Sequence, residues 1–161
     1  MEKKKLYAAI VGYGNRGQVY GDYSLQCPDE FGVAAVIDPK EFKLREAKER
    51  YGLSDERLFC DFASFLKSGI KCDFVINATM DQFHYETTME ILGAGYDLLV
   101  EKPIVPNEKE LLDIKNLAEK KGVRVFVCHV LRYSPFYTKI KEILNLSLIH
   151  ISEPTRRRGI S

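Results

Sequence analysis

The sequence predicts an α/β fold of the Rossmann type, in which helices cover a doubly wound, mostly parallel sheet. Short apolar runs alternate with segments of helical periodicity along most of the chain. The first apolar run leads directly into a GxGxxG turn, Gly12 to Gly17. The 161 residues are too few for the eight βα units of a barrel, so an open sheet is the better prediction.

The first predicted unit is a strand, a glycine-rich turn and a helix. The strand is expected over Leu6–Val11. Gly12 would then allow a tight turn, Gly14 would let a pyrophosphate approach the backbone, and Gly17 would let helix and strand pack closely. The helix opens with Asn15-Arg16, and its free N–H groups and partial positive charge suit phosphates. NAD is therefore the expected cofactor, with NADP possible.

Asp38 follows the second predicted strand, Gly32–Ile37, and has two compatible interpretations. It lies about 20 residues beyond the glycines, where a carboxylate can accept both ribose hydroxyls of an adenosine. With Pro39 and Glu41 it also forms a capping-box pattern, which predicts Asp38 as the N-cap of the next helix. A carboxylate here favours NAD over NADP, whereas Lys40 offers a cation for a 2′-phosphate.

The later elements continue the alternation. Strands are expected over Leu58–Cys60, Phe74–Ala78, Tyr96–Val100 and Val123–Val127. Helix ends are expected at Gly52 and Gly122, and helix starts at Asn107 and at Ser134-Pro135.

Residues that follow the strands are candidate site residues, because ligands of an open α/β sheet bind outside the carboxyl ends of its strands. Thr79 and His84 follow the fourth strand, and Lys102 follows the fifth. A lysine there can donate to a substrate oxygen, although spacing alone also permits an ordinary surface turn. His84 either contacts the cofactor or packs at a helix start. His129, after the sixth strand, is interpreted as structural, and Arg132 either balances a ligand charge or pairs with a surface acid.

These motifs, in this order, resemble the N-terminal domain of the Gfo/Idh/MocA family of sugar and inositol dehydrogenases. The motifs are the glycine turn, Asp38, Thr79 with His84, Glu101-Lys102-Pro103, and His129 followed by Arg132-Tyr133-Ser134-Pro135. The resemblance covers about residues 5–145 and is most specific at the Glu-Lys-Pro triplet.

The resemblance implies roles for the candidate residues. Lys102 would lie beside the nicotinamide and bind the reacting hydroxyl of a sugar or polyol. Glu101 and Pro103 would hold the lysine, and the Lys102–Pro103 peptide could be cis. Thr79 and His84 would line the nicotinamide side of the cofactor cleft.

The resemblance further implies an NAD(P)-dependent dehydrogenase that transfers hydride between a hydroxyl-bearing carbon and nicotinamide. In this family a second, mostly antiparallel sheet domain follows and supplies the general base. We expect that domain to be missing here, the fragment to be inactive by itself, and its parent to be a homo-oligomer. The alternative is a non-catalytic NAD(P)-binding sensor or regulatory protein of the same fold.

The last residues depart from this pattern. We expect residues 1–145 to form the Rossmann domain and residues 146–161 to be a non-native tail, because residues 146–156 resemble a translated sequencing adaptor. The alternative is a genuine first strand of a second domain, since Leu146, Leu148 and Ile149 are apolar.

Composition excludes several other classes of protein. A net charge of +1 produces no overall electrostatic field that would attract nucleic acid or an anionic membrane. No apolar stretch approaches the ~20 residues of a membrane span. The four cysteines have no metal-ligand spacing, so no metal site is expected. The sequence predicts a cytoplasmic protein whose partner is a small-molecule sugar or polyol.

Overall fold

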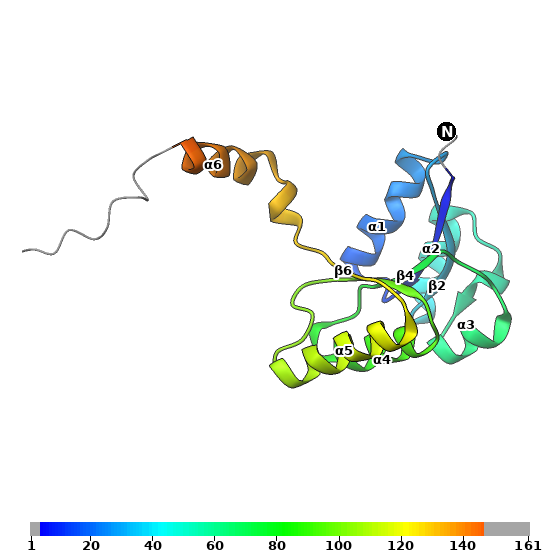
Figure 1. Cartoon of the computed structure of the whole chain (residues 1–161). Coiled ribbons are helices and arrows are strands. Elements are labelled where there is room, and N and C mark those ends of the chain that lie inside the picture. The colour runs from blue at the N-terminus through cyan, green and yellow to red at the C-terminus, as the bar shows by residue number, and fades with distance from the viewer. Residues whose placement is uncertain (1–3, 147–161) are drawn as a thin grey trace, which may run out of the picture. The chain divides into compact units, whose positions relative to one another are not determined.

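The computed structural model describes residues 4–146, and the chain divides after Cys128 into two units (Figure 1). The first unit holds the sheet. Its strands are β1 (Leu6–Val11), β2 (Phe31–Ile37), β3 (Leu58–Phe59), β4 (Phe74–Asn77), β5 (Asp97–Val100) and β6 (Val125–Val127). Its helices are α1 (Asn15–Gln26), α2 (Glu41–Tyr51), α3 (Phe62–Ser68), α4 (His84–Gly93) and α5 (Glu108–Lys121), with short 3-10 turns η1 (Asp55–Arg57) and η2 (Asp81–Phe83).

The second unit contains η3 (Val130–Tyr133) and α6 (Pro135–Leu146). The helix predicted to begin at Ser134-Pro135 is therefore confirmed. Of the predicted tail, residues 146–161, the first residue ends α6 and residues 147–161 lie outside the described residues. None of the helices within residues 4–146 is long and apolar enough to cross a membrane.

The sheet has the strand order β3-β2-β1-β4-β5-β6, and all of its pairings are parallel. This is the order of dinucleotide-binding domains, with the direction of winding reversed between β1 and β4. The Rossmann prediction is thus confirmed. The two edge strands, β3 and β6, are shorter than their apolar runs suggested, and each pairs with a neighbour on one side only.

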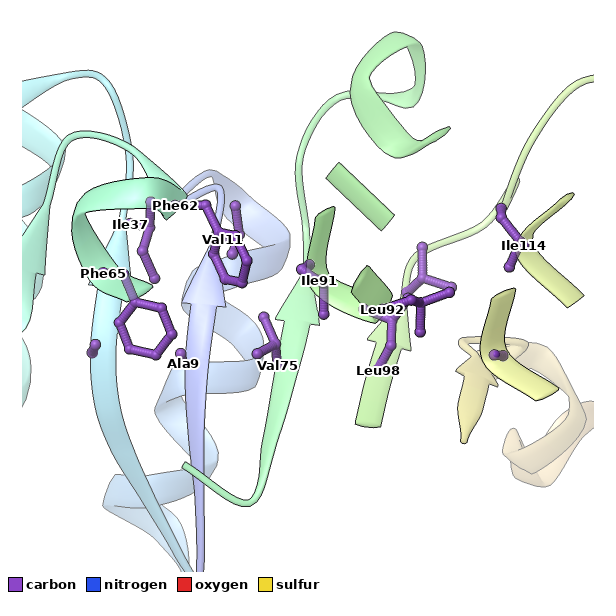
Figure 2. Close-up of a cluster of buried hydrophobic side chains, with 13 residues drawn as sticks. Ala9, Val11, Ile37, Phe62, Phe65, Val75, Ile91, Leu92, Leu98 and Ile114 are labelled. Carbon is purple, nitrogen blue, oxygen red and sulfur yellow. The ribbon is translucent and has the colours of Figure 1, made fainter. Parts of the chain in front are cut away.

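Two apolar clusters cover the two faces of the sheet, which explains why its strands are nearly continuous apolar runs. On one face Val11 and Val75 pack with Phe65 of α3, Ile91 of α4 and Ile114 of α5 (Figure 2). In Figure 1 these three helices lie along one side of the sheet. On the other face the cluster includes Ala8, Ile10 and Ile76 with Tyr13 of the glycine turn and Leu44 and Ala47 of α2.

Helix ends follow the sequence signals in most places. Gly52 and Gly122 end α2 and α5 in the left-handed conformation, at φ +64° and +66°. The side chain of Asn107 caps α5 by accepting the Glu110 N–H at 2.9 Å. Asp61 caps α3 in the same way, a cap that the sequence reasoning missed.

Candidate functional site

The first and third glycines of the turn are required by the fold itself. Gly12 has φ +87°, and a Cβ there would lie 2.7 Å from the carbonyl oxygen of Ala78. A Cβ on Gly17 would lie 2.2 Å from the carbonyl oxygen of Gly12 and 3.2 Å from the Ile10 side chain. These contacts agree with the predicted roles of Gly12 in the tight turn and of Gly17 in close packing of α1 on β1.

Gly14 differs from both, because nothing in the described part of the chain requires a glycine there. A Cβ on Gly14 would have no heavy atom within 4 Å, and its φ of −85° suits any residue. Gly14 is also the N-cap of α1, with no side-chain capping bond and no acidic residue in the first turn. The N–H groups of Asn15 and Arg16 therefore have no intrahelical partner, and the space beside Gly14 is open, which is the usual setting of an anion site.

Asp38 lies beside this turn and not at a helix start. Its carboxylate is buried, and it accepts the Tyr13 N–H at 2.8 Å and the Lys40 N–H at 2.9 Å. The prediction that Asp38 is the N-cap of α2 is wrong: α2 begins at Glu41, and Lys40 is its N-cap without a side-chain bond. The carboxylate is used instead to hold the glycine turn against the end of β2. Each carboxylate oxygen still has a lone pair for a hydroxyl donor.

Asn77 organises the end of β4, although the sequence reasoning gave it no role. It is fully buried, and its Oδ1 accepts both the N–H and the hydroxyl of Thr79, at 3.2 and 2.7 Å. Its Nδ2 donates to the Thr88 hydroxyl of α4 at 3.1 Å. The sequence did contain a signal for this role, because Asn77 is an amide side chain at the end of a buried apolar run. Asn77 thus fixes Thr79 at the carboxyl edge of the sheet.

His84 joins the loop after β4 to the turn after β5. Its ring is 1% exposed, with Nδ1 2.7 Å from the Pro103 carbonyl oxygen and Nε2 3.1 Å from the Thr79 carbonyl oxygen. The tautomer decides which carbonyl accepts the ring N–H. Both ring nitrogens face backbone carbonyl oxygens of the protein, which supports the packing interpretation. A direct contact of His84 with a cofactor stays a prediction.

Glu101 lies beneath the turn that carries Lys102. Its carboxylate is 5% exposed, and Oε2 accepts the Lys102 N–H at 3.2 Å. Oε1 accepts the hydroxyl of Tyr20 at 2.6 Å and lies 3.4 Å from Nε of Arg16. Glu101 therefore holds the backbone of this turn with a carboxylate that is nearly removed from solvent, and its role in orienting the Lys102 side chain stays a prediction.

Lys102 itself is exposed, and the Lys102–Pro103 peptide is cis. Within residues 4–146 its ammonium group has no hydrogen bond or ion pair. A cation without an internal partner, at the carboxyl end of β5, is available to a ligand oxygen. The described part of the chain has no group of three or more His, Cys, Asp or Glu side chains suited to a metal ion.

Tyr20 is the second residue that the sequence reasoning missed. It lies one turn after Arg16 on α1, so both side chains share the helix face that meets Glu101. Burial raises the pKa of Tyr20, and its contacts with Cys128 and Glu101 raise it further. The hydroxyl therefore keeps its proton and remains a donor.

His129 and Arg132 belong to the second unit, where the Arg132 N–H donates to the His129 carbonyl oxygen.

Comparison with known proteins agrees with this geometry. The model of an oxidoreductase family with an NAD-binding Rossmann fold, Gfo/Idh/MocA, matches residues 6–129. The chain belongs to this family. The resemblance predicted from the motifs is thus confirmed.

The Gfo/Idh/MocA relatives include inositol dehydrogenases. An NADP⁺-dependent scyllo-inositol 2-dehydrogenase of Bacillus subtilis is 26% identical over 136 residues, which are 84% of this chain and 36% of that protein. An inositol 2-dehydrogenase/D-chiro-inositol 3-dehydrogenase of Lactiplantibacillus plantarum is 26% identical over 141 residues, 87% of this chain and 40% of that protein.

Solved structures share the fold. Apo scyllo-inositol dehydrogenase from Lactobacillus casei has a TM-score of 0.80 at 20% identity, over 91% of this chain and 43% of that one. An NAD-binding protein from Listeria innocua has a TM-score of 0.77 at 29% identity, over 89% of this chain and 41% of that one. The chain spans about two fifths of the length of the relatives that it matches.

Proposed function

We propose that this chain is the cofactor-binding part of an NAD(P)-dependent dehydrogenase that acts on a cyclitol, polyol or sugar. The Gfo/Idh/MocA match supports the reaction class, and the inositol dehydrogenases among the relatives support the substrate class. The observation that carries the proposal is the open space beside Gly14, at a helix N-terminus without a capping side chain. We further propose that these residues alone bind cofactor without turnover, because the relatives are more than twice as long.

The residues at the site fit a dinucleotide. The space beside Gly14 and the N–H groups of Asn15 and Arg16 suit a pyrophosphate. The remaining lone pairs of Asp38 suit the ribose hydroxyls of the adenosine, and its negative charge disfavours a 2′-phosphate. We therefore propose NAD as the preferred cofactor and NADP as the weaker one. Bound nicotinamide supplies the hydride acceptor or donor.

Lys102 would act on the substrate oxygen. Its free ammonium group can donate a hydrogen bond to a hydroxyl and so orient the carbon that exchanges hydride. As the hydroxyl becomes a carbonyl, the same donor stabilises the negative charge that develops on oxygen. Thr79 and Pro103 border this position through their contacts with His84. A homo-oligomeric parent enzyme and a cytoplasmic location stay predictions.

Substitution of Gly14 by Ala tests the cofactor site. The backbone of Gly14 accepts a side chain without strain, so the variant should fold normally, but the methyl group would occupy space that a pyrophosphate needs. We expect the dissociation constant of NADH, measured by fluorescence titration, to rise about tenfold, which corresponds to about 1.4 kcal/mol.

The matched control is Gly93→Ala. Gly93 ends α4, and a Cβ there would also meet nothing within 4 Å, so this variant should bind NADH as the unaltered chain does. Equal affinity of the unaltered chain and the Gly14→Ala variant would show that the turn does not hold the pyrophosphate. No saturable binding to the unaltered chain would contradict the proposal altogether.

A further inference from the structure

Tyr20 connects the helix of the glycine turn with the backbone of Lys102. Its hydroxyl donates to Oε1 of Glu101 at 2.6 Å, and Oε2 of the same carboxylate accepts the Lys102 N–H at 3.2 Å. Tyr20 belongs to α1, whose N-terminus is the proposed pyrophosphate site. Two hydrogen bonds thus connect the cofactor helix with the turn that carries the free ammonium group.

The Glu101 carboxylate needs such a donor because it is nearly removed from solvent. Its side chain is 6% exposed, and a buried carboxylate is costly unless hydrogen-bond donors surround it. Arg16 is the other candidate, but its side chain is 48% exposed and its Nε is 3.4 Å from Oε1. Ion pairs open to solvent contribute little. Tyr20 therefore supplies the stronger contact to Glu101.

The Tyr20 hydroxyl has one proton and two neighbours. Besides Oε1 of Glu101, the Sγ atom of Cys128 at the end of the first unit lies 2.6 Å away. The carboxylate is the better acceptor of the two, since hydrogen bonds to an ionised group are stronger than those to sulfur. Because burial and both neighbours raise the pKa of Tyr20, this donor persists at high pH.

We propose that Tyr20 is a positioning residue for Lys102 and acts through Glu101. The role of Lys102 rests on the function proposed above, whereas the contacts of Tyr20 do not. One helix would then hold both the phosphates of the cofactor, at its N-terminus, and the substrate-binding lysine, through a side chain one turn further on. The distance between cofactor and lysine would be set inside this single unit.

The test is site-specific amide exchange in Tyr20→Phe, followed by NMR without cofactor. The substitution removes one oxygen atom and leaves the ring. Without its donor, the Glu101 carboxylate should turn toward solvent and release the Lys102 N–H, whose exchange should rise about tenfold or more. The Leu98 N–H, which donates to the Arg124 carbonyl oxygen at 2.8 Å within the sheet, should exchange at its original rate.

Tyr23→Phe is the control, since it removes the same atom from the same helix. The Tyr23 hydroxyl donates to Glu30 at the surface, so the exchange rate of the Lys102 N–H should not change in this variant. Glu101→Gln is a second test variant, and its result is used if Tyr20→Phe does not fold. An amide has one acceptor oxygen instead of two, so Tyr20 and the Lys102 N–H would compete for it, and the Lys102 amide should again exchange faster.

The inference is overturned if the exchange rate of the Lys102 amide is unchanged in Tyr20→Phe or, where that variant does not fold, in Glu101→Gln. It is also overturned if the exchange rates of the Lys102 and Leu98 amides rise together, because that would show that Tyr20 merely stabilises the fold. NADH titration of the same variants separates the two proposals. Tyr20→Phe should bind NADH within about threefold of the unaltered chain, since its ring does not border the Gly14 space. Failure of the unaltered chain to bind NADH would reject the proposed function alone.

Discussion

Single residues at the carboxyl ends of β1, β2, β4 and β5 make up the candidate site, but they contribute in different ways. Within residues 4–146, Gly14 and Lys102 have no internal use: the first leaves open space and the second leaves a free cation. Asp38, His84 and Glu101 are buried and bonded inside the protein. Residues of the first kind are suited to contact ligands directly, whereas those of the second kind also shape the turns around them.

Asp38→Asn tests whether the residue selects the cofactor. It removes the negative charge and keeps the size of the side chain. We expect the preference for NADH over NADPH, taken as the ratio of their dissociation constants, to fall about tenfold because the repulsion of a 2′-phosphate is lost. Fluorescence titration with each nucleotide measures the ratio.

Glu41→Gln provides the comparison for Asp38→Asn. Glu41 is an exposed carboxylate at the first residue of α2, paired with Arg45, so it undergoes the same change of charge close by. Its variant should keep the original ratio. If Asp38→Asn also keeps that ratio, Asp38 serves only to anchor the glycine turn through the Tyr13 N–H.

At the scale of elements, the helices that cover the sheet are defined by local signals at their ends. Gly52 and Gly122 end their helices as predicted, and Asn107 caps α5. The capping box at Asp38 failed because a buried carboxylate had a competing partner, the glycine turn, which lies 25 residues earlier. Local capping patterns hold where the side chain is exposed and no distant donor competes for it.

Asn107→Ala measures how much the N-cap of α5 contributes to the free energy of unfolding. The Asn107 side chain accepts the Glu110 N–H, and without it that N–H has no partner within the first turn of α5. We expect the free energy of unfolding, from urea titration, to fall by about 1 kcal/mol. Asn107→Ser keeps a capping oxygen and should lose only a fraction of that. An equal loss in both variants would mean that the cap is not the cause.

The whole molecule depends on a core that is complete within the first unit. Both apolar clusters are made of residues between Ala8 and Val127, and Phe65 at the centre of one of them is fully buried. The proposed domain boundary at residue 145 therefore lies beyond every residue of these two clusters.

Ending the chain after Asn145 tests that boundary. Because the clusters lie within residues 8–127, removal of residues 146–161 should change the free energy of unfolding by less than about 1 kcal/mol. Urea denaturation of the two chains, followed by circular dichroism, gives the difference. A loss of several kcal/mol would contradict the proposal that residues 146–161 are a non-native tail and would favour a genuine structural segment.

The sequence by itself determined the Rossmann fold class, most of the strands and the motif residues that follow them. Periodicity and glycine spacing are local, and Gly12, Gly14, Gly17 and Lys102 stand in a short motif or directly after a strand. Such signals are readable because they depend on neighbours a few residues away.

Only the tertiary structure decided which side chains support the site. Tyr20 and Glu101 are 81 residues apart in the chain. His84 contacts the Pro103 carbonyl oxygen only because β4 and β5 pair and bring the loops after them together. The position of Asp38 was also decided in three dimensions, by a backbone donor from another strand–helix turn. Hydrogen bonds of buried polar groups depend on which partners the packed sheet brings near, and a linear pattern does not contain that information.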